Sequence, residues 1–108
     1  MRLIVFLWVA IIAVPVFSET THSDKKVKII HSGDTRDCFF FQLENVSQAD
    51  PVSPNNEWFA VPFSKMSSDA VLSILMASKA SGGSVKVNTT GSTVCGAYAE
   101  VKNVSWLP

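Results

Sequence analysis

The sequence predicts a small, mostly β domain with one helix, on three observations. Short runs rich in β-branched and aromatic residues, separated by turn residues, predict five strands. One stretch rich in helix formers lies between the third and fourth strands and ends at a pair of glycines. The 108 residues suffice for a single small domain. The order β-β-β-α-β-β predicts an OB-fold-like five-stranded barrel, and an α+β sandwich is the alternative.

The first eighteen residues have the order of a secretory signal peptide. Arg2 supplies a positive charge, residues 3–14 form an unbroken apolar run, and Pro15 precedes the small residue Ser18. We therefore expect cleavage between Ser18 and Glu19, and a secreted or periplasmic protein. The alternative is an uncleaved membrane anchor, but this apolar run is short for a hydrocarbon core of ~30 Å. No later stretch is long and apolar enough to form a transmembrane segment.

The N-terminal half of the mature chain predicts a leader and three strands. Residues 19–25 are polar, and we expect a flexible leader there, so that the folded domain covers residues 26–108. A short β-branched run over residues 27–30 predicts the first strand. Residues 37–46 carry the strongest strand signal, with apolar side chains on both faces at the start. After a loop that is rich in proline and asparagine, residues 57–61 predict the third strand.

The helix is expected over residues 70–80, with serines before it as candidate N-caps and Gly82-Gly83 as its stop. Its apolar side chains span an arc of about 200° at 100° per residue, which suits a helix pressed broadly against a sheet. The side chains in this arc are Val71, Leu72, Ile74, Leu75 and Met76.

The last third of the chain predicts a hairpin. Residues 84–90 alternate apolar and polar side chains, Gly91-Ser92 has turn chemistry, and residues 94–101 predict the fifth strand. The alternation slips near Lys102 and Asn103, which predicts a bulge or bend there.

Cys38 and Cys95 are the two cysteines, and both lie in the mature chain. An even number of cysteines in an exported small domain indicates a disulfide. Two free buried thiols are the alternative. We expect no metal site, since two cysteines without a histidine cluster do not supply a tetrahedral ligand set.

Charge and motif content exclude several function classes. Nine basic and nine acidic residues give no net charge, which argues against a nucleic-acid partner. His22 and His31 stand in no metal-ligand or nucleophile spacing, and the carboxylates are scattered. There is no glycine-rich phosphate loop. We therefore expect a protein that is not an enzyme, has no catalytic residues and carries no cofactor.

Three aromatic residues, Trp58, Tyr98 and Trp106, are the candidate ligand-binding residues. Carbohydrate sites use aromatic faces to stack sugar rings, with hydroxyls and amides nearby for hydrogen bonds. The alternative is that all three are core or interface residues.

Three stretches of the chain resemble a known family. Residues 27–38 followed by 39–46 look like its first two strands, with a cysteine early in the second. Residues 68–83, leading into the strand that starts at Ser84, resemble its helix and fourth strand, and Cys95 resembles its late cysteine. The family is that of the receptor-binding B subunit of subtilase cytotoxin and its relatives among five-B-subunit bacterial toxins.

That resemblance implies an OB-fold, export, a homopentamer, a glycan ligand and an exported partner enzyme subunit. It covers most of residues 27–101, and it matches none of the family's ligand-contacting residues to a position in this chain. We therefore expect a secreted or periplasmic non-catalytic binding module that is glycan-binding and oligomeric. The alternative is a structural or protein-interaction subunit of an exported complex.

Overall fold

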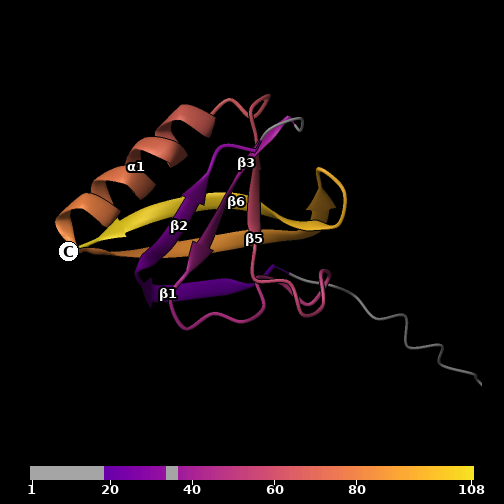
Figure 1. Ribbon diagram of the computed structural model, residues 1–108, viewed down its shortest axis with the longest axis horizontal. Helices are drawn as coiled ribbons and strands as arrows, with labels where there is room; N and C mark the ends of the chain where they lie inside the picture. Colours follow the sequence, from indigo (N-terminus) through magenta and orange to yellow (C-terminus); the bar gives the residue numbers. More distant parts are fainter. Residues whose placement is uncertain (1–18, 34–36) are drawn as a thin grey trace, which may run out of the picture.

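The computed structural model describes residues 19–33 and 37–108 and contains one sheet and one helix within them (Figure 1). The mostly β class with one helix is confirmed. The expected signal peptide over residues 1–18, with Ser18 at its cleavage position, lies outside the described residues. The elements are β1 (Thr21–Lys25), β2 (Val27–His31), β3 (Cys38–Leu43), β4 (Phe59–Pro62), α1 (Ser68–Ser81), β5 (Ser84–Val94) and β6 (Tyr98–Leu107).

The six strands form one mixed sheet in the order β1-β5-β6-β4-β3-β2. Neighbouring strands are antiparallel except β4 and β6, which are parallel. The edge strands β1 and β2 are consecutive in the chain, with Lys26 alone between them. One stretch of chain thus pairs with β5 through its first half and with β3 through its second.

The expectation of a flexible leader over residues 19–25 is wrong, because most of it forms β1. This strand pairs with β5, with Thr21 opposite Asn88 and Lys25 opposite Val85. Strand pairing needs only the backbone, and β1 is largely exposed, so its side chains are polar although its backbone is ordered. The strand raises the expected five strands to six.

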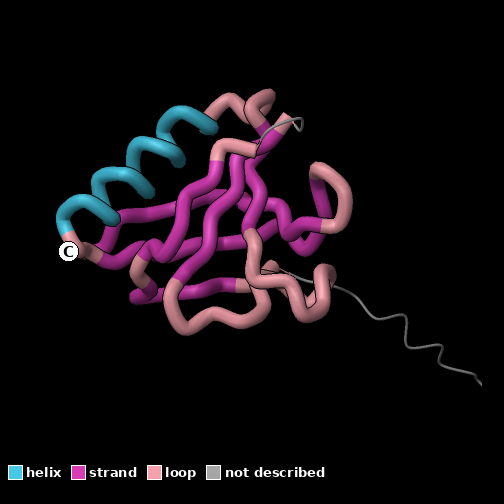
Figure 2. Tube along the Cα trace, viewed as in Figure 1, coloured by secondary structure: helices cyan, strands magenta, loops and turns pink. Residues whose placement is uncertain are grey.

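Strand β3 separates two apolar clusters, because its alternating side chains point to opposite faces and all of them are buried. Phe41 stacks on Phe59 of β4 with ring centroids 4.9 Å apart, and Val71 and Leu75 of α1 pack on this face. Figure 2 shows the helix lying along one side of the strands. The main core on this face consists of Val27, Phe39, Phe41, Leu43, Val46, Ala49, Phe59, Val61, Val71, Leu75, Val85, Val87, Ala99, Val101 and Val104.

Helix α1 begins two residues before the expected start and ends one residue after the expected end, at the expected glycine stop. Gly82 follows its last residue with φ 71°, a left-handed conformation that glycine adopts without strain, and its N–H donates to the carbonyl of Ser78. The buried face is narrower than the expected arc, since the side chain of Met76 is 56% exposed.

The hairpin turn between β5 and β6 lies at residues 95–97, so the expected turn at Gly91-Ser92 is wrong. Gly91 has φ 81°, yet it lies inside β5 at a register shift between Thr89 and Thr93. A glycine with positive φ is typical of a β-bulge as well as of a turn, and here Gly91 forms part of a bulge in β5.

The bulge expected near Lys102 and Asn103 is confirmed. Asn88 lies opposite Asn103, whereas the next residue, Thr89, lies opposite Val101, so β6 carries an extra residue there. This shift explains why Val104 returns to the buried face after Lys102 and Asn103 are exposed.

Candidate functional site

The expected disulfide between Cys38 and Cys95 is confirmed. It joins the start of β3 to the turn between β5 and β6, with Cα atoms 6.4 Å apart and 57 positions of chain between them. Cys38 is fully buried, whereas Cys95 is partly exposed in the turn. The bond therefore fastens a surface turn to β3, two strands away from β6 in the sheet.

A second apolar cluster surrounds this disulfide on the face of β3 opposite the main core. Phe40 and Ala60 are buried in it, and Trp58 and Tyr98 pack against them while keeping part of their surface exposed. The rings of Phe40 and Tyr98 lie 4.8 Å apart. The exposed ring of His31 lies 6.5 Å from Phe40 and 6.0 Å from Trp58. We call His31, Phe40, Trp58 and Tyr98 the aromatic face.

Hydrogen bonds fix the backbone beside each of the two partly exposed rings. The backbone N–H of Trp58 donates to the Asn56 side-chain oxygen at 3.0 Å, a local turn that sets the start of β4. Tyr98 follows the disulfide-bonded turn, in which the carbonyl of Ala97 accepts a hydrogen bond from the Ser53 hydroxyl. These contacts fix the backbone that carries the two side chains, so less backbone has to be ordered when a ligand binds, which lowers the entropic cost of binding.

Trp106 lies apart from the other two candidate residues. It stands near the end of β6, whereas Tyr98 begins that strand, so roughly 26 Å of strand separates them at about 3.3 Å per residue. Its side chain is 52% exposed beside Gly83. The structure therefore brings Trp58 and Tyr98 together and leaves Trp106 elsewhere.

Sequence reasoning missed Phe40 and His31 as members of the aromatic face. The available signal was the parity of β3, which places Phe40 on the same side as Cys38 and therefore on the side of the disulfide. The position of His31 follows from the pairing of β2 with β3, in which His31 lies opposite Phe40. That register is not visible in local sequence.

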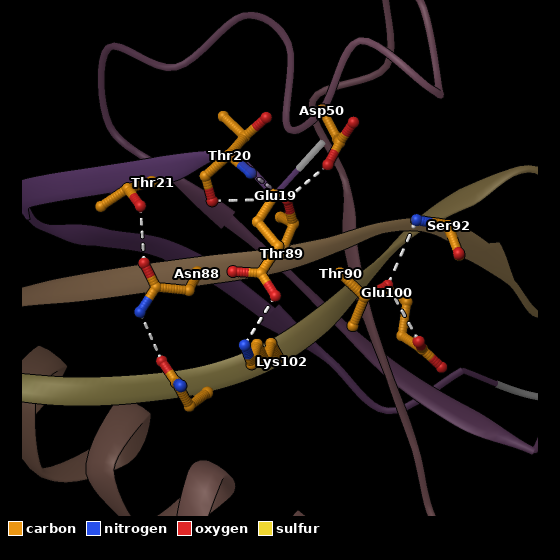
Figure 3. A network of polar contacts seen from close by, with 11 residues as sticks. Glu19, Thr20, Thr21, Asp50, Asn88, Thr89, Thr90, Ser92, Glu100 and Lys102 are labelled. Atoms are coloured by element: carbon orange, nitrogen blue, oxygen red, sulfur yellow. Dashed lines mark hydrogen bonds and ion pairs between the residues drawn. The ribbon is translucent and has the colours of Figure 1, made fainter. Parts of the chain in front are cut away.

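A network of polar contacts ties β1 to β5 and to the loop after β3 (Figure 3). The Thr89 hydroxyl donates to the fully buried carboxylate of Asp50 and accepts from the N–H of Thr20 at 3.0 Å. The Asp50 carboxylate also accepts from the N–H of Val52, and His22 Nε2 donates to the carbonyl of Ala49 at 2.8 Å. These polar groups satisfy one another, so we assign this network to the stability of the fold.

The exposed side of the same network crosses three strands. Asn88 accepts from the Thr21 hydroxyl at 2.7 Å and donates to the Asn103 side-chain oxygen at 2.6 Å (Figure 3). Lys102 forms an ion pair at 2.6 Å with Glu19. Glu19 is the residue expected to become the N-terminus after cleavage. Exposed pairs of this kind contribute little to stability.

Among the described residues, no group of three histidine, cysteine, aspartate or glutamate side chains is arranged to hold a metal ion. In the same part of the chain, no helix is long and apolar enough to cross a membrane. Comparison of the chain with protein-family models and with curated proteins finds no match.

Proposed function

We propose that this protein is a non-catalytic binding module that takes a glycan on the aromatic face. The observation that carries the proposal is the gathering of Trp58 and Tyr98, both partly exposed, around the buried ring of Phe40. Rigid aromatic side chains offer large contact areas at a small entropic cost, and their faces suit the C–H side of a sugar ring.

Strand order supports a finer assignment of the sheet as an OB-fold-like barrel. Strands β2 to β6 follow one another in the order β2-β3-β4-β6-β5, and β4 and β6 are parallel. The single residue Lys26 joins the two edge strands, so a bend there brings the first stretch of chain to both edges. On such a barrel β3 and β4 would be the second and third strands, over which OB-folds bind oligonucleotides and oligosaccharides. Phe40 lies in β3 and Trp58 directly precedes β4, while His31 and Tyr98 extend the aromatic face to β2 and β6. Zero net charge favours the sugar.

The disulfide supports an oxidising location, and we propose that the protein is secreted or periplasmic. A homopentamer and an exported partner enzyme subunit, both implied by the resemblance to toxin B subunits, are parts of the same proposal. The second candidate function is a structural or interaction subunit of an exported complex. It is favoured by Phe63 and Met66, which are exposed apolar side chains in the connection between β4 and α1.

A glycan array followed by titration calorimetry tests the proposed site on the purified mature protein. Trp58→Ala is expected to weaken glycan binding about tenfold, since an aromatic contact contributes roughly 0.5–1.5 kcal/mol beyond its buried area. Phe63→Ala is the matched control, because Phe63 is an exposed ring outside the aromatic face. The proposal is wrong if no glycan binds, or if both variants bind the glycan as tightly as the wild type.

Light scattering on the same sample separates the two candidate functions. A homopentamer that survives Phe63→Ala supports the toxin-like module. A monomer that binds no glycan but associates with an exported partner through Phe63 and Met66 supports the interaction subunit.

A further inference from the structure

Two hollows lie at the C-terminal end of α1, where the end of the chain returns beside the last helical turn (Figure 1). Ser78 and three charged side chains, Lys26, Glu44 and Lys79, line the polar hollow. Trp106 and the last two residues of the chain line the apolar hollow. Gly83 belongs to both linings, so the two adjoin across a residue without a side chain. We call them together the helix-end pocket.

The hydroxyl of Ser78 is the first observation that points to a ligand. Ser78 is fully buried, it lines the polar hollow, and none of the described residues offers its Oγ a hydrogen bond. Its carbonyl, by contrast, accepts from the N–H groups of Gly82 and Gly83 and from the Ser81 hydroxyl. A buried hydroxyl without a partner destabilises the folded chain, and alanine is a better helix former. Folding alone therefore gives no reason for serine here.

Charge around the polar hollow selects against simple ions. The C-terminal end of a helix and the carboxylate of Glu44 disfavour an anion. The ammonium groups of Lys26 and Lys79 disfavour a cation, although Lys79 already donates to the carbonyl of Lys28 at 2.9 Å. A neutral ligand with several hydroxyl groups can accept from the lysines and donate to the carboxylate. The hollow measures about 160 Å³, well above the roughly 10–15 Å³ that a single water needs, so it has room for more than one water.

The apolar hollow supplies the complementary contact. A Cβ atom built on Gly83 would lie 2.6 Å from Trp106 Nε1, so the indole rests directly against this glycine. The side chain of Trp106 nevertheless stays 52% exposed. An apolar wall beside convergent polar groups is the usual composition of a small-molecule site.

We propose that the helix-end pocket binds a neutral pyranose, with the apolar face of the sugar against Trp106 and a ring hydroxyl against Ser78. The site is separate from the aromatic face and does not rest on the function proposed for it. Solvent does not reach the Ser78 hydroxyl in the free chain, so the polar hollow must open around Ser78 when the sugar binds. Occupation then gives this hydroxyl the partner that the described chain does not supply.

The test titrates the mature protein with the methyl α-glycosides of glucose, galactose and mannose, and follows saturation-transfer NMR and tryptophan fluorescence. Ser78→Ala is expected to raise the melting temperature of the free protein and to weaken binding at least fivefold. Gly83→Ala is expected to weaken binding to the same extent, because the new methyl group displaces the indole. Trp106→Ala is expected to abolish it.

Two controls keep the outcomes distinct. Met76→Ala removes an exposed apolar side chain of the same helix that does not line the pocket, and it is expected to leave binding unchanged. Trp58→Ala is also expected to leave it unchanged, which separates this site from the aromatic face. If none of the three glycosides binds the wild type, the pocket holds water only and the proposal is wrong. Binding that survives both Ser78→Ala and Trp106→Ala, or that is lost with Trp58→Ala, overturns it equally.

Discussion

Replacement of Cys38 or Cys95 with serine is expected to lower the free energy of unfolding by roughly 2–5 kcal/mol. The two half-cystines are 57 positions apart in the chain. The loop-entropy relation gives about 4 kcal/mol for a loop of that length at 25 °C. Total stability of a small domain is about 5–15 kcal/mol, so one bond accounts for a large share of it.

The two single substitutions differ because the two sulfur atoms lie in different surroundings. Cys38 is fully buried against Phe40 and Ala60, and serine there places a hydroxyl in an apolar cluster. Cys95 lies in a partly exposed turn, where a hydroxyl reaches water. Cys38→Ser should therefore cost about 1 kcal/mol more than Cys95→Ser. The double substitution should cost little more than Cys38→Ser alone, since both changes remove the same bond.

Urea unfolding with and without reductant measures these differences, and intact mass of the exported protein should show two hydrogens fewer than the dithiol. Alkylation provides a positional check. The thiol that remains in Cys38→Ser is Cys95, which should react quickly, whereas Cys38 in Cys95→Ser should be protected until the chain unfolds. Two thiols that alkylate freely in the native wild type would refute the reasoning, as would additive costs in the double variant.

Three further substitutions test the core, the helix end and the polar network. Phe59→Ala should lower the free energy of unfolding by about 3–5 kcal/mol, because a fully buried ring stacked on another leaves a cavity; a loss under about 1 kcal/mol in urea unfolding contradicts it. Gly82→Ala should cost about 1 kcal/mol through its φ of 71° alone, since a Cβ there meets no atom within 4 Å; an unchanged melting temperature contradicts it. Thr89→Val should cost about 1–3 kcal/mol by removing the hydroxyl donor to buried Asp50, and unchanged urea unfolding contradicts it.

Elements with strong periodicity could be predicted from the sequence. The alternation of Phe39, Phe41 and Leu43 separates the two faces of β3, and the run from Ser84 to Asn88 does the same for β5. The helix was predictable because a run of helix formers ends at Gly82, a residue that adopts the left-handed backbone of a helix end without strain. By contrast, β1 is polar and gains its order from backbone pairing with β5, so no hydrophobic pattern marks it.

The aromatic face was predictable only in part. Trp58 and Tyr98 are large aromatic residues in a weakly charged chain, and composition alone singles them out. Their proximity depends on β4 lying between β3 and β6, an arrangement of strands far apart in the chain. The separation of Trp106 from Tyr98 follows from the length of β6, which extends past the bulge that the slipped alternation predicted.

The disulfide and the hydrogen bonds of Thr89 stabilise different parts of the sheet, and their loss should have different effects. The disulfide stabilises mainly by restricting the unfolded chain, so its reduction should raise hydrogen exchange throughout the core by global unfolding. The hydrogen bonds of Thr89 act in the folded state, where they hold Thr20 and Asp50 against β5. Thr89→Val should therefore raise exchange first in β1 and in residues 47–56, while β3 and β4 keep their protection. Equal increases in all strands would mean that β1 opens only with the whole domain, and that the single-residue link at Lys26 transmits disorder from one edge of the sheet to the other.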